Sequence, residues 1–132
     1  MASRSAYLDS SAYVKAVLRE SGEAALLTEL ANWDGYVSSA LLAVESIRAC
    51  ARRSSADALE ARRWLEGVSL LPMDDLILDI ASELAPTRLR SLDALHLATA
   101  LSVRDEIGLF VSYDDRLAEA ADDQGLTVAQ PA

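Results

Sequence analysis

The amino-acid sequence predicts an α/β fold, a single domain with a mostly parallel central sheet and helices on both of its faces. Short apolar runs that resemble buried strands alternate with longer segments in which apolar residues recur at helical spacing. Glycine, proline and small polar residues separate many of these segments. The length of 132 residues suits one domain, so we assign residues 1–132 to a single unit.

Five short runs are predicted to be strands. Because a helix separates most successive runs, the strands are expected to pair in parallel. The predicted strands are residues 6–8, 36–38, 68–71, 109–112 and, at an edge of the sheet, 126–128.

Seven segments with helical periodicity connect these strands. Ser91 is the expected N-cap of the sixth helix, and Gly108 is expected to end it. Gly125 is expected to close the seventh. The predicted helices are residues 10–19, 23–32, 40–53, 56–66, 74–84, 92–106 and 114–124.

Composition excludes several classes of protein. A hydrophobic content of 52% with 25% charged residues indicates a compact chain rather than a disordered one. No apolar run approaches the roughly 20 residues of a membrane span, and the first residues lack the apolar stretch of a signal peptide. We therefore expect a cytoplasmic protein without a membrane anchor. Cys50 is the single cysteine, so no internal disulfide forms.

Two acidic residues stand where a strand is expected to end and a helix to begin. In parallel α/β sheets the functional crevice lies beyond the carboxyl ends of the strands, so Asp9 and Asp114 should face it. Each could instead serve only as a helix N-cap. Ser10 could take over that capping role from Asp9, whereas Asp115 could replace or assist Asp114.

Two further acids lie on predicted helices. Glu45 could form a simple surface ion pair with Arg48, and Asp93 could merely favour the helix dipole from the first turn. The apolar residues around Asp93 predict that its carboxylate is partly buried, and a buried carboxylate needs a partner such as a cation. Acids without a histidine or cysteine cluster are typical of Mg²⁺ sites, where metal-activated water attacks a phosphodiester in line.

Four segments together resemble the PIN-domain family, and within it the VapC-type toxins of bacterial toxin–antitoxin pairs. They are YLDSSAYVK (7–15), SALLAVESIRA (39–49), RSLDALHLATA (90–100) and FVSYDDRLAEAA (110–121). The resemblance spans almost the whole chain, and the combination is more specific than any one motif.

The resemblance implies that Asp9, Glu45, Asp93 and Asp114 form a catalytic site for Mg²⁺ or Mn²⁺. Ser112 matches the hydroxyl-bearing position before the last acid, and Ser10 and Asp115 are expected to support the acids or act as alternative ligands. The implied activity is hydrolysis of RNA. A cognate VapB-like antitoxin is the implied inhibitor, and a homodimer is the implied assembly.

Two groups of residues near these acids have open roles. His96, three residues after Asp93, is expected to be a packed histidine bonded to a backbone carbonyl rather than a general base. Arg88 and Arg90 precede Asp93 and either grip a substrate phosphate or simply solvate a loop.

The formal net charge of −9 opposes RNA binding but suits a basic antitoxin segment. Two alternatives to a toxin remain at this stage. One is a PIN nuclease of RNA processing or decay, and the other is a non-catalytic interaction module in which the acids only cap helices.

Overall fold

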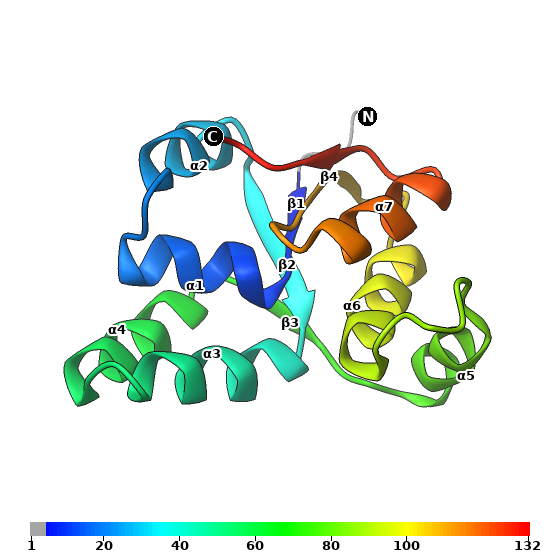
Figure 1. The fold of residues 1–132 in the computed structure, drawn as a ribbon, viewed down its shortest axis with the longest axis horizontal. Coiled ribbons are helices and arrows are strands. Elements are labelled where there is room, and N and C mark those ends of the chain that lie inside the picture. Colours follow the sequence, from blue (N-terminus) through cyan, green and yellow to red (C-terminus); the bar gives the residue numbers. More distant parts are fainter. Residues whose placement is uncertain (1–4) are drawn as a thin grey trace.

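Helices and strands alternate along residues 5–132, the part of the chain that the computed structural model describes (Figure 1). The strands are β1 (Ser5–Leu8), β2 (Gly35–Ser39), β3 (Ser69–Leu71), β4 (Ile107–Val111) and β5 (Val128–Ala129). The helices are α1 (Ser10–Leu18), α2 (Glu23–Leu30), α3 (Leu41–Ala51), α4 (Ser55–Leu65), α5 (Asp75–Glu83), α6 (Ser91–Ser102) and α7 (Asp115–Asp123). No helix within this range is long and apolar enough to cross a bilayer.

The five strands form one sheet in the order β3-β2-β1-β4-β5, and every neighbouring pair is parallel. The chain builds the sheet outward from β1 to β3 and then returns to place β4 on the other side of β1. The strand order therefore reverses between β1 and β4. In open α/β sheets this reversal creates the crevice at the carboxyl ends of the strands where ligands bind.

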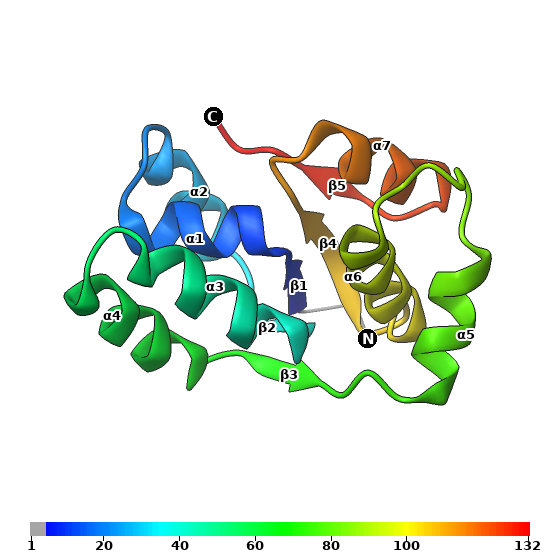
Figure 2. The ribbon, with the colours of Figure 1, turned by 60° about the horizontal axis from the view of Figure 1, so that its bottom comes forward.

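Helices cover both faces of the sheet, as the sequence predicts. Helices α1 to α4 lie on one side, and α5 to α7 lie on the other (Figures 1 and 2). Because side chains alternate along a strand, β1 contributes to both cores. Ala6 and Leu8 pack with the first group of helices, whereas Tyr7 packs with the second and stacks on Phe110 at a centroid distance of 5.2 Å.

The predicted helix 92–106 is too long. Helix α6 ends at Ser102, and Gly108 lies inside β4 instead of ending the helix. The pairing of β4 with β1 changes register at this point, since Ser5 pairs with Ile107 and Ala6 with Leu109. Gly108 is the extra residue of this irregularity. The spacing of apolar residues did not show that the helix ends at Ser102 and that a buried strand begins at Ile107.

Two predictions about segment ends have different outcomes. Ser91 is not the N-cap of α6, because Arg90 holds that position and no side chain caps the helix there. Gly125 does follow the end of α7 with a φ of +89°, a conformation that glycine adopts without strain. The last strand lies at the sheet edge as predicted, although it begins only at Val128.

Candidate functional site

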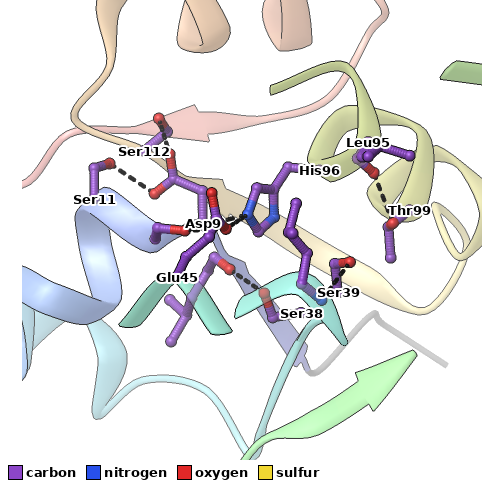
Figure 3. Close-up of polar contacts among 12 residues, drawn as sticks. Asp9, Ser11, Ser38, Ser39, Glu45, Leu95, His96, Thr99 and Ser112 are labelled. Atoms are coloured by element: carbon purple, nitrogen blue, oxygen red, sulfur yellow. Dashed lines mark hydrogen bonds and ion pairs between the residues drawn. The ribbon is translucent and has the colours of Figure 1, made fainter. Parts of the chain in front are cut away.

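The four predicted acids come from four different elements at the crevice end of the sheet. Asp9 follows β1 directly, and Asp114 lies three residues after the end of β4. Glu45 lies within α3, and Asp93 lies in the first turn of α6. Figure 3 shows Asp9 and Glu45 beside His96 and Ser112.

Asp9 is almost completely buried and receives three hydrogen bonds. Its side chain caps α1, because Oδ1 accepts from the backbone N–H of Ala12 at 3.0 Å and from Ser11 Oγ at 2.7 Å. Its other oxygen accepts from Ser112 Oγ at 2.6 Å. Asp9 itself, and not the alternative Ser10, therefore caps this helix. Burial raises the pKa of the Asp9 carboxyl, and the bonds from Ser112, Ala12 and Ser11 oppose that effect.

Ser112 connects Asp9 to Asp114. The Ser112 hydroxyl is buried, donates to Asp9 and accepts from the backbone N–H of Asp114 at 3.1 Å. Asp114 in turn caps α7, since its Oδ1 accepts from the N–H groups of Arg116 and Leu117 at 3.0 and 3.1 Å. Capping uses only one carboxylate oxygen of Asp114. The other oxygen, Oδ2, accepts from Arg90.

Arg90 joins Asp114 to Asp93. Its guanidinium lies 3.0 Å from Asp114 Oδ2 and 3.3 Å from Asp93 Oδ2. Burial raises the pKa of Asp93 and the charge of Asp114 raises it further, whereas Arg90 lowers it. Two carboxylates from different helices thus share one cation. Arg90, for which the sequence left a phosphate contact or a solvated loop position open, is bound to the acids in this structure.

Glu45 does not pair with Arg48, the partner considered from the sequence. Its Oε1 lies 2.7 Å from His96 Nε2 and also accepts a hydrogen bond from Ser10 Oγ. Burial would raise the pKa of Glu45, but the bonds from His96 and Ser10 outweigh it and the pKa is lowered. Glu45 is therefore held as a carboxylate.

His96 is buried, as expected, but its partners are side chains and not a backbone carbonyl. The Tyr7 hydroxyl lies 2.8 Å from His96 Nδ1, on the opposite side of the ring from Glu45. Because a carboxylate only accepts hydrogen bonds, Nε2 carries the hydrogen toward Glu45, and in the tautomer that has its hydrogen on Nε2 alone, Nδ1 accepts from Tyr7. Tyr7, His96 and Glu45 therefore form a chain of hydrogen bonds from the core to the crevice.

Asp115 lies apart from this cluster. Its side chain is exposed, and its Oδ1 accepts from Gln130 Nε2 at 3.1 Å. Asp114, by contrast, contacts the same guanidinium as Asp93. This geometry favours Asp114 over Asp115 as the fourth acid of the site.

Two side chains that support the site, Tyr7 and Ser11, were not predicted from the sequence, and neither were the side-chain partners of His96. One signal was available for His96, since it lies one helical turn after Asp93 and so on the same face of the helix. No local pattern identified Tyr7, because its contact with His96 spans 89 positions.

A divalent cation is the cofactor that these residues suit. Within residues 5–132, no three acidic, histidine or cysteine side chains form a ready set of metal ligands. The chemistry nevertheless fits Mg²⁺, which takes oxygen ligands and usually needs only one or two carboxylates with waters. Asp93 and Asp114 already share a cation in the guanidinium of Arg90. The donor set therefore fits a hard metal ion.

The His96 network predicts a graded loss of stability. In His96→Leu, the Tyr7 hydroxyl and the Glu45 carboxylate lose a partner, and we expect the free energy of unfolding to fall by about 3 kcal/mol. His96→Gln keeps an N–H donor that reaches Glu45, so its loss should be about half as large. Urea denaturation followed by tryptophan fluorescence measures both. Equal stability of His96→Leu and the wild type would contradict the network.

The buried Asp9 predicts a pH dependence with a defined sign. The pKa of the Asp9 carboxyl is higher in the folded protein than in the unfolded chain, where it is about 3.9. The protonated carboxyl therefore stabilises the fold below about pH 3.9, and this contribution is lost as the pH rises through the pKa of the folded state. Wild type should therefore lose stability relative to Asp9→Asn as the pH rises above about 4 in the presence of chelator. Asn at this position keeps the oxygen that caps α1. The urea midpoints of both proteins are measured across this pH range. A difference between the two midpoints that stays constant with pH would contradict the prediction.

Comparison with known proteins agrees with this architecture. Residues 6–123 match the PIN domain family. Ribonuclease VapC46 of Mycobacterium tuberculosis (strain ATCC 25618 / H37Rv) is 42% identical over 125 residues, which cover 95% of this chain and 96% of that protein. Ribonuclease VapC47 of M. tuberculosis (strain CDC 1551 / Oshkosh) is 35% identical over 130 residues, with the same coverage of each chain.

A solved structure shares the fold at much lower sequence identity. It is a chain from the crystal structure of VapBC2 from Rickettsia felis bound to a DNA fragment from their promoter. It superimposes with a TM-score of 0.73 at 12% identity, covering 97% of this chain and 99% of that one. With the matching sequence and the parallel sheet that carries acids at its switch point, the chain belongs to the PIN domain family.

Proposed function

We propose that this chain is a metal-dependent ribonuclease of the VapC type that hydrolyses phosphodiester bonds of RNA. One observation carries the proposal. Carboxylates from separate elements converge at the switch point of the sheet, where Ser112 links Asp9 to Asp114 and Arg90 links Asp114 to Asp93. The relatives named ribonucleases VapC46 and VapC47 support the choice of RNA as substrate.

The acids would hold the metal. Asp93 and Asp114 would bind it through the oxygens that now face Arg90, and Asp9 and Glu45 would complete the acidic lining. When bound, Mg²⁺ or Mn²⁺ lowers the pKa of a bound water and neutralises charge on the phosphate. The chain itself fixes the acids in place, because Ser112 orients Asp9 while Ser10 and His96 orient Glu45.

We also infer a protein partner that inhibits the site. The solved neighbour is a VapBC complex, which supports a VapB-type antitoxin for this chain. A net charge of −9 favours association with a basic segment, and such a segment could place a cation where Asp93 and Asp114 already share one. A homodimer is the assembly that we propose for the free enzyme.

Adjacent acids provide a matched test of the proposed metal site. Asp114→Asn should lower Mg²⁺-dependent cleavage of total bacterial RNA by at least 100-fold, because it removes a charge that faces the cation position. Asp115→Asn removes the same charge one residue away, where the side chain contacts Gln130, and should cleave within threefold of wild type. Cleaved ends are counted by sequencing, with and without chelator. Equal activity of Asp114→Asn and wild type, or cleavage that survives chelator, would refute the metal site.

A further inference from the structure

A cavity of about 270 Å³ lies between the segment 85–89 and α7. Its lining includes Pro86, Arg88, Leu89, Arg116, Glu119 and Asp123. Pockets for small ligands measure roughly 300 to 1,000 Å³, so this cavity suits one nucleotide rather than several.

The two walls of the cavity adjoin, in the sequence, residues that hold Asp93 and Asp114 together. Arg88 precedes by two residues the Arg90 that bonds to Asp93 and Asp114. Arg116 follows Asp114 by two residues, and its backbone N–H donates to the Asp114 carboxylate. Residues that line the cavity therefore lie two positions in the sequence from residues of the acid cluster on both of its walls.

Two arginines line the cavity, and neither has a charged partner in the part of the chain that the structure describes. Arg53, Arg63 and Arg90 each pair with a carboxylate. Arg88 and Arg116 are exposed, and among residues 5–132 neither guanidinium pairs with a carboxylate or donates a side-chain hydrogen bond. In a chain with a net charge of −9, unpaired guanidinium groups beside the site provide the positive charge that a phosphate requires.

The charged side chains of α7 make one end of the cavity basic and the other end acidic. Residues 116, 119, 120 and 123 share one face of α7, so Arg116 lies at the end near Asp114 while Glu119 and Asp123 lie one and two turns farther away. Leu89 and Ala120 supply an apolar lining. Carboxylates accept hydrogen bonds from the amino groups of nucleobases.

We propose that this cavity binds the RNA nucleotide next to the scissile phosphate, an inference that rests on the proposed ribonuclease function. Arg88 and Arg116 contact the phosphate of that nucleotide, and Glu119 and Asp123 face the edge of its base. The acidic end favours a base with an exocyclic amino group over uracil.

Cleavage kinetics on total bacterial RNA with Mg²⁺ test the phosphate contacts. Arg88→Gln and Arg116→Gln should each raise KM about tenfold with kcat within twofold, and each should reduce the slope of log affinity against log salt by about one. Arg62→Gln is the matched control, because Arg62 is exposed on α4 and does not line the cavity. An unchanged KM in both cavity variants would overturn the proposal.

Sequencing of the cleaved ends tests the base contact. Wild type should enrich amino-bearing bases next to the cut, and the double variant Glu119→Gln, Asp123→Asn should lose at least half of that enrichment. The same base frequencies in both proteins would overturn the assignment of the acidic end. Thermal unfolding of each variant verifies that it is folded.

The outcomes separate this inference from the proposed function. If wild type cleaves and the cavity variants match it, the subsite is wrong while the ribonuclease assignment stands. If neither wild type nor Asp115→Asn cleaves RNA with Mg²⁺ or Mn²⁺, the proposed function fails and the subsite fails with it.

Discussion

The burial of Asp9 at the end of the central strand is the constraint on which the site depends. A carboxylate that is only 3% exposed must find its hydrogen-bond donors within the protein. Two come from the first turn of α1, and the third is Ser112. Ser112 reaches Asp9 because β4 pairs with β1 so that Val111 lies beside Leu8. The start of α1, the strand register and the position of Asp114 are therefore coupled through one side chain.

A second constraint comes from the alternation of side chains along β1. Tyr7 points toward α6 while its neighbours point toward α1 to α4, so its hydroxyl meets His96 from inside the core. His96 then orients Glu45, a residue of the opposite layer. The network joins helices on both faces of the sheet. A buried polar network is stable when each of its polar groups has a hydrogen-bond partner. In this chain His96 is the partner of both Tyr7 and Glu45.

Local patterns predicted much of the fold and part of the site. Strand-end placement predicted that Asp9 and Asp114 face one crevice, because parallel strands end on the same side of a sheet. Partners distant in sequence were not predictable in the same way. The bond between Glu45 and His96 spans 51 positions, and hydrophobic periodicity contains no information about it. The end of α6 was misjudged because Val103 and Ile107 continue an apolar pattern in a chain that has already left the helix.

The acidic composition of the chain does not decide whether RNA can approach it. Charges on the surface are screened over about 8 Å at physiological ionic strength, so the local arrangement matters more than the total of −9. Arg90 already offsets part of the charge of Asp93 and Asp114, and a bound metal ion would offset more. In the sequence, Arg88 lies two residues before Arg90, and Arg116 lies two residues after Asp114. Arg88, Arg90 and Arg116 thus supply positive charge near the position that we propose for the phosphate, and the net charge of the whole chain suits the basic partner that we propose.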